Sequence, residues 1–124
     1  MELLTARYGN PHLAGDPGAK VRITVGAPRF KLPYKLAGSI PELFPLRAMW
    51  GVGESRFRDL YLELLEVRGG VEVIRARLEA IAAASGTDRL ILLCFEKPGL
   101  FCHRQVFATW WRQQTSEVVP ELPE

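Results

Sequence analysis

Apolar residues recur along the chain with more than one period, and two of the patterns predict strands. Residues 20–26 alternate, because polar residues separate Val21, Ile23 and Val25. This alternation is typical of a strand with one buried face. Residues 89–96 read RLILLCFE and are almost continuously apolar between two turns. Such a run predicts a strand that is buried on both faces.

Three further segments have the spacing of helices. Apolar residues three and four positions apart predict a helix over residues 55–67. A second helix is expected over residues 71–85, with Gly86 as its C-terminal cap. A third begins near Cys102 and runs to about Gln114, with a wide aromatic face.

The remaining segments are rich in turn-forming residues. We expect residues 1–19 to be irregular, apart from a candidate short strand at residues 3–5. Residues 27–53 contain four prolines, which predicts a long irregular segment with at most one helical turn near residues 39–43. The tail at residues 118–124 is expected to be extended or frayed.

These elements predict a single α/β domain over residues 1–124. A helix, a buried strand, a short loop and a helix follow one another in the chain, which favours parallel strands with helices against them. We therefore expect a small, mostly parallel sheet with helices packed against it, in a three-layer, Rossmann-like arrangement. Ligands of such sheets bind outside the carboxyl ends of the strands, which directs attention to the segment after Leu93.

Composition narrows the class of protein without naming its activity. The chain has 124 residues, of which 48% are apolar and 24% charged, as in ordinary globular domains. A net charge of +2 is too small to indicate nucleic-acid binding by itself. No apolar run is long enough to span a membrane, and the N-terminal residues do not resemble a secretory signal. We expect a cytoplasmic protein with reduced cysteines and no membrane partner, and the sequence leaves its oligomeric state open.

Five residues around the end of the buried strand are the candidate site. Cys94 and Glu96 are two positions apart, so they share a face if the strand is regular. Cys102, His103 and Arg104 open the following helix. A helix N-terminus lowers the pKa of a thiol and attracts anions, so chemistry is expected here.

Three functions compete for these residues. In the first, Cys102 is a nucleophile, Arg104 holds an anionic group, and Glu96 or His103 moves protons, with Cys94 completing the catalytic set. In the second, Cys94, Cys102 and His103 bind a metal such as zinc, with Glu96 as a further candidate ligand. Their spacing matches no common zinc motif, so no metal site and no cofactor are predicted. In the third, the two thiols form a reversible disulfide, which no Cys-x-x-Cys motif supports.

A structural interpretation is open for the same residues. Cysteine is among the most buried residue types, so core packing explains Cys94 equally well. Glu96 can simply pair with Arg104. Trp110 and Trp111 are more often core residues than a platform for stacking bases.

A second candidate surface follows the first of the two predicted strands, at residues 26–35. Basic and aromatic residues alternate there, and Arg29, Lys31 and Tyr34 are candidate ligand-binding residues for a phosphate or a nucleotide. A solvated loop anchored by its aromatic residues explains the pattern equally well. The expected partner is a small anionic ligand, and the sequence gives only weak support to nucleic acid.

The stretch LILLCFEKPGLFCHRQVFATWW resembles the signature of the domain of unknown function 488 family. In that signature a strand ending Leu-Leu-Cys-x-Glu precedes a loop and then Cys-His-Arg at the start of a helix. The stretch VRITVGAPRFKLPY is similar to the N-terminal part of an actinobacterial and phage-type branch of the family. The resemblance covers residues 20–122, although the loop at 97–101 is shorter than in many members. It implies an α/β fold in an intracellular bacterial or phage protein, and no established reaction.

We therefore expect an enzyme or enzyme-like domain with a Cys/Glu/His/Arg site that acts on an anionic ligand, with a nucleotide as one candidate. One alternative is a module that binds a nucleotide, a nucleic acid or a protein without chemistry. The other is a domain with a structural metal site. Substrate and reaction are not specified by the sequence.

Overall fold

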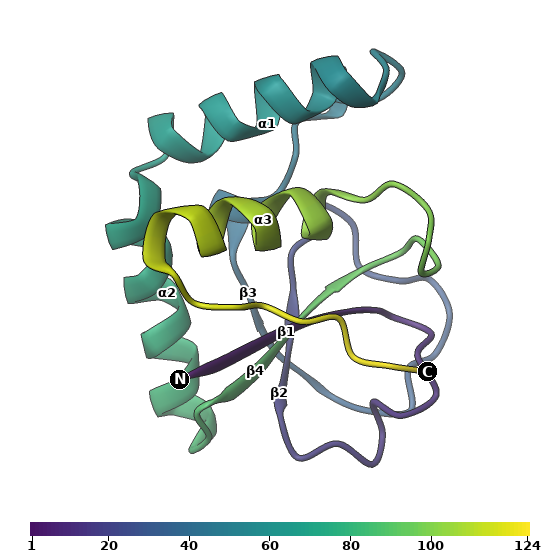
Figure 1. Cartoon of the computed structure of the whole chain (residues 1–124). Coiled ribbons are helices and arrows are strands. Elements are labelled where there is room, and N and C mark those ends of the chain that lie inside the picture. Colours follow the sequence, from purple (N-terminus) through teal and green to yellow (C-terminus); the bar gives the residue numbers. More distant parts are fainter.

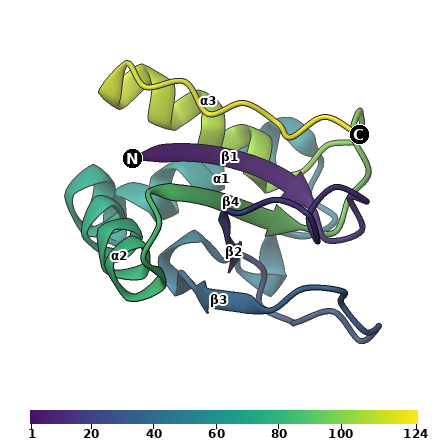
Figure 2. The same ribbon diagram turned by 90° about the horizontal axis from the view of Figure 1, so that it is seen from below.

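The computed structural model describes residues 1–124 and contains a four-stranded sheet. The strands are β1 (Glu2–Arg7), β2 (Ala19–Arg22), β3 (Leu36–Ser39) and β4 (Arg89–Cys94). All of them are parallel, in the order β1-β4-β2-β3 (Figure 2). Strand β4 pairs with β1 on one side and with β2 on the other, as expected for the most apolar strand.

Helices supply the second layer of the fold. They are the short 3-10 turns η1 (Pro41–Leu43) and η2 (Arg47–Met49) and the helices α1 (Glu54–Val67), α2 (Gly70–Ser85) and α3 (His103–Thr115). The three predicted α-helices are confirmed to within one residue at each end. Helices α1 and α3 lie alongside each other, and α2 runs across their ends (Figure 1). None of the helices has both the length and the apolar character that crossing a membrane requires.

The side chains of β4 alternate between two apolar clusters. Leu90, Leu92 and Cys94 belong to the larger cluster, which contains the buried residues of all three α-helices. Ile91 and Leu93 belong to the smaller cluster on the other face. That face is covered by the irregular β1–β2 and β2–β3 connections and by the C-terminal tail. The predicted α/β fold with helices against a parallel sheet is confirmed, and its third layer consists of irregular chain.

The first two strands differ in extent from the sequence prediction. β1 covers six residues of the segment 1–19, so only the part after Arg7 is irregular. β2 ends at Arg22, four residues before Gly26. The guanidinium of Arg22 donates to two carbonyl groups of the turn that follows, which holds the chain away from a strand conformation.

Strand β3 lies in the segment 27–53, for which the sequence predicts no strand. Its sequence, LAGS, contains Ala37 and Gly38, two poor strand formers, and no alternation. It forms because the edge of β2 is free to pair with it. Tertiary pairing therefore overrides local propensity here.

The C-terminal tail runs beside β1 as an extended segment (Figure 1). The Thr5 N–H donates to the carbonyl of Pro120 at 2.9 Å, and the Leu122 N–H donates to the carbonyl of Thr5 at 2.7 Å. Val119 and Leu122 are buried. The tail thus covers an edge of the sheet that would otherwise be open.

Candidate functional site

The carboxyl ends of the four parallel strands lie at one edge of the sheet, and the two cysteines meet there. Cys94 is the last residue of β4. Cys102 is the N-cap residue of α3, in extended conformation, and His103 is the first residue of that helix. Cys94 and Cys102 are 0% exposed and His103 is 1% exposed. Strand and helix pack in the same apolar cluster, so all three side chains point inward.

The two ring nitrogens of His103 differ in their hydrogen bonding. Its Nε2 lies 2.8 Å from the carbonyl oxygen of Ile23, which can only accept, so Nε2 carries the proton. Its Nδ1 lies 3.7 Å from Sγ of Cys94 and 3.9 Å from Sγ of Cys102. Nε2 also lies 3.4 Å from the Cys94 sulfur. Nδ1 is therefore the unprotonated nitrogen, and both sulfur atoms lie within 3.9 Å of it, although the Cys94 sulfur is closer to Nε2.

Cys94, Cys102 and His103 form a cluster that could hold a metal ion. One ligand atom from each lies within 4.8 Å of the others. All three residues are buried, so water does not compete strongly for them. We call these three residues the thiol–imidazole cluster.

The two thiols of the cluster differ in acidity. Burial raises the pKa of Cys94 well above its usual value. A hydrogen bond from the Cys94 thiol lowers the pKa of Cys102, and His103 and the N–H of Arg104 lower it further against the effect of burial. The N-terminus of α3 adds a partial positive charge. Of the two thiols, Cys102 is therefore the more acidic, and Cys94 is the one that donates to it.

A pocket of about 240 Å³ opens beside the cluster. Its walls come from the loops that follow β2, β3 and β4. The lining residues are Thr24, Val25, Gly26, Pro45, Trp50, Phe95, Glu96 and His103. His103 therefore belongs both to the buried cluster and to the pocket. A second hollow of about 180 Å³, between α1 and α3, contains none of the predicted site residues.

Glu96 is the only acidic side chain in this pocket, and the lining contains no lysine or arginine. Its carboxylate is partly buried and forms no ion pair. Burial raises the pKa of Glu96, and interaction with Cys102 raises it further. The structure therefore places Glu96 next to the thiol–imidazole cluster, on its open side.

Arg104 lies apart from the pocket, although it was expected to hold an anion there. Its side chain is completely buried, and its Nε and Nη2 donate to the carboxylate of Glu121 at 2.8 to 3.2 Å. Its Nη1 has no hydrogen-bond partner. The pairing of Arg104 with Glu96 that the sequence left open is also absent. Arg104 is thus paired with a carboxylate of the protein itself and is not available to hold an anionic ligand in the pocket.

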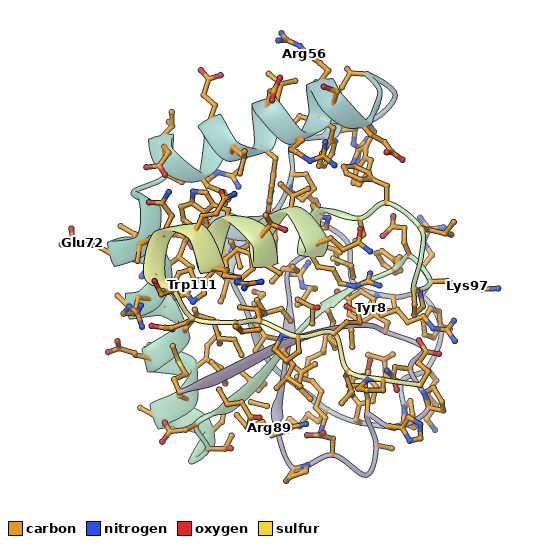
Figure 3. All side chains as sticks on the ribbon, viewed as in Figure 1. Tyr8, Arg56, Glu72, Arg89, Lys97 and Trp111 are labelled. Atoms are coloured by element: carbon orange, nitrogen blue, oxygen red, sulfur yellow. The ribbon has the colours of Figure 1, made fainter.

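The predicted ligand residues of the segment 26–35 do not line the pocket. Arg29 and Lys31 are exposed and lie farther along the loop. Tyr34 donates to the carbonyl of Tyr8 at 2.8 Å and packs on the face of the sheet opposite the helices. Tyr8 itself, labelled in Figure 3, is buried. Of the segment, only Gly26 contributes to the lining.

Two aromatic residues of the pocket were not among the predicted site residues. Trp50 is 48% exposed and Phe95 is 45% exposed. The ring of Trp50 lies edge-on to His103, with ring centres 6.3 Å apart. The sequence signal that could have identified Trp50 is a tryptophan in a loop rich in proline. Phe95, between Cys94 and Glu96, gave no such signal because it lies in an apolar run that predicts a buried strand.

Comparison of the chain with protein-family models, with curated proteins and with solved structures finds no match. The resemblance to the domain of unknown function 488 family stays a prediction. Function has to be inferred from the site itself.

Proposed function

We propose that the protein is a small zinc enzyme of the hydrolytic class. The thiol–imidazole cluster holds the ion, and Glu96 stands beside the coordination position that faces the pocket. The hydrogen bond of His103 carries the proposal, because Nε2 donates to the Ile23 carbonyl, which leaves Nδ1 without a proton and within 3.9 Å of both sulfur atoms. Histidines that bind metals usually donate their other ring N–H in this way, which fixes the ring for ligation.

The spacing of the ligand atoms supports zinc. With Zn–S near 2.3 Å and Zn–N near 2.0 Å, tetrahedral geometry puts sulfur and nitrogen about 3.6 Å apart. The Nδ1 atom of His103 is 3.7 Å from one sulfur and 3.9 Å from the other. Thiolate and imidazole donors also favour zinc over magnesium or calcium, which prefer oxygen.

Burial favours a metal site over a thiol nucleophile. A nucleophile must reach an atom of the substrate, whereas a metal ligand only has to reach the ion. Neither Cys94 nor Cys102 lines the pocket, and both side chains are fully buried. His103 and Glu96 do line it. In the proposed centre the ion faces the substrate and the thiols stay behind it.

Three protein ligands leave a fourth position for water, as in catalytic zinc sites. Zinc lowers the pKa of its water to about 7, which provides a hydroxide nucleophile. Glu96 accepts the proton that this water loses and returns it to the leaving group. One water molecule is consumed for each bond broken, and no oxidant or reductant is needed.

Elemental analysis of the purified protein tests the metal directly. We expect about one equivalent of zinc per chain, and less than about a tenth would overturn the proposal. Cys94→Ser and Cys102→Ser are each expected to lose most of the zinc. Glu96→Gln is the matched control and should retain it, because Glu96 is not proposed as a ligand.

Replacement of zinc by cobalt tests whether the site is open. Azide or thiocyanate should change the visible spectrum of the cobalt protein by occupying the fourth position. An unchanged spectrum would indicate a closed, structural site and would contradict the hydrolytic proposal.

A further inference from the structure

Acidic and basic side chains are separated around the pocket. Three loops line it, and their parts nearest the lining residues, 24–31, 44–53 and 95–101, contain one acid, Glu96. Their basic residues are Arg29, Lys31, Arg47 and Lys97. All four are exposed, none forms an ion pair, and we call them the basic rim. Lys97 points away from the molecule (Figure 3). Negative charge thus lies in the pocket, and positive charge lies on the loops around it.

The same loops expose most of the large apolar side chains of the surface. Seven of the ten exposed large hydrophobic residues lie on them: Val25, Phe30, Leu46, Trp50, Val52, Phe95 and Leu100. Such a concentration at one edge marks a binding surface. Trp50 and Phe95 also line the pocket, where an aromatic ring can receive a flat ligand.

The size and charge of the pocket narrow the ligand class. Its volume of about 240 Å³ is below the roughly 300–1,000 Å³ of pockets that enclose a whole drug-sized molecule. A single ring system is therefore the unit that fits inside. Aromatic walls with one carboxylate suit an organic cation or a heteroaromatic ring with N–H donors. The basic rim repels a cation and attracts a phosphate, so a heteroaromatic ring that carries a phosphate fits better than an organic cation.

We infer that the pocket binds the base of a nucleotide, which stacks on Trp50 and donates N–H groups to Glu96 while its phosphate lies on the basic rim. The inference names the substrate class of the zinc centre, and in that respect it rests on the proposed function. Adenine, cytosine and guanine carry an exocyclic amino group that can donate to a carboxylate, whereas uracil offers only an N3–H between two carbonyl oxygens. The nucleotide comes either from the free pool or from a single-stranded nucleic acid.

Calorimetric titration with CMP and UMP tests the role of Glu96. We expect CMP to bind at least about tenfold more tightly than UMP, because the only donor of uracil on this edge, N3–H, lies between two carbonyl oxygens that the Glu96 carboxylate repels. Glu96→Gln should reduce this preference to about twofold or less. A preference of less than about twofold in the unmodified protein would overturn the inference.

Substitutions at Trp50 test stacking. Trp50→Ala should weaken both nucleotides roughly tenfold, while Trp50→Phe, which keeps an aromatic face, should stay within about threefold of the unmodified protein. Trp50 is about half exposed, so both variants are expected to fold. Equal affinity in all three proteins would place the nucleotide elsewhere and overturn the inference.

A double substitution in the basic rim tests recognition of the phosphate. Arg29→Ala combined with Lys31→Ala should weaken CMP several-fold, reduce its salt dependence, and leave cytidine unaffected. A ten-nucleotide cytidine DNA that binds more than about tenfold tighter than CMP assigns the source to single-stranded nucleic acid. Comparable affinities assign it to free nucleotides. If neither probe binds at millimolar concentration, the inference fails.

Zinc content, measured on the same samples, distinguishes failure of the nucleotide inference from failure of the proposed zinc function. Zinc without nucleotide binding removes this inference and leaves the zinc centre. Nucleotide binding without zinc removes the proposed function and keeps the pocket as a nucleotide site without chemistry.

Discussion

The guanidinium of Arg104 is neutralised by Glu121, a residue of the C-terminal tail, 17 positions along the chain. Nε and Nη2 of the arginine lie 3.0 and 2.8 Å from the carboxylate oxygens. The hydroxyl of Thr5 in β1 donates to the same carboxylate at 2.6 Å. One carboxylate therefore joins the start of α3, the tail and the edge strand of the sheet.

Removal of this carboxylate should destabilise the protein strongly. Glu121→Ala leaves Arg104 buried without a counter-charge, and we expect a loss of about 2 to 4 kcal/mol in the free energy of unfolding. Urea denaturation measures it. Glu124→Gln is the control, because Glu124 pairs with Arg7 at the surface and its loss should have little effect. Similar losses in the two variants would contradict the role of Glu121.

Metal removal should lower stability if the thiol–imidazole cluster binds zinc. At a free zinc concentration 100 times the dissociation constant, binding stabilises the folded state by about 2.7 kcal/mol. A chelator should therefore lower the melting temperature, and added zinc should restore it. The Cys102→Ser protein should not respond to the chelator. A melting temperature that is the same with and without chelator would count against the site.

Thiol alkylation separates the zinc centre from a reactive cysteine. Buried, metal-bound cysteines should react with iodoacetamide at pH 7 more slowly than free cysteine, by roughly tenfold or more. A chelator should accelerate the reaction. Mass spectrometry identifies which of Cys94 and Cys102 is modified. Fast modification of Cys102 in the zinc-loaded protein would favour the nucleophile instead.

The junction between α1 and α2 should not tolerate a side chain at Gly69. This residue has φ 113°, and a Cβ atom there would lie 2.2 Å from Cγ2 of Val73. We expect Gly69→Ala to destabilise the protein by about 2 to 4 kcal/mol. Gly51→Ala is a matched control, because Gly51 also has positive φ but open space around it, and about 1 kcal/mol is expected. Equal values in the two would show that contact with Val73 is unimportant.

Stability should fall in acid in part through Asp16. Hydrogen bonds from Arg89, at 2.9 and 2.6 Å, lower the pKa of the Asp16 carboxyl below its usual value. A carboxyl with a lowered pKa in the folded state stabilises it above about pH 4, and this contribution is lost as the pH falls further.

Asp16→Asn keeps an oxygen for the N–H of Gly18 but removes the charge. We expect the variant to be about 1 kcal/mol less stable at pH 7, with the difference shrinking below pH 4. Urea denaturation at pH 7, 5 and 3 measures this. A difference independent of pH would show that the charge of Asp16 does not act through Arg89.

The sequence alone was sufficient to predict the helices and strands whose apolar residues follow a strong pattern. β4 is apolar on both faces because it lies between two clusters, and α1 and α2 each present one apolar stripe. β3 was not predictable, because its pairing depends on the edge of β2 and its own residues carry no pattern. Local patterns reveal elements that bury their own side chains, and they miss those held by backbone pairing alone.

The candidate site was predictable only in part. Cys94, Cys102 and His103 come together because a strand end and a helix start flank one short loop, which the sequence shows. The partner of Arg104 could not be foreseen, since Glu121 reaches it only through the path of the tail. Trp50 approaches His103 from a loop 53 positions earlier in the sequence, and no spacing rule relates the two.

Strand β1 pairs with β4 on one side and with the tail on the other. During synthesis on the ribosome, residues 2–7 emerge long before residues 89–122, so β1 has no neighbour for most of translation. Such distant pairings slow folding and leave apolar chain exposed in the meantime. β1 is therefore expected to gain its neighbours on both sides only after residue 122 has left the ribosome.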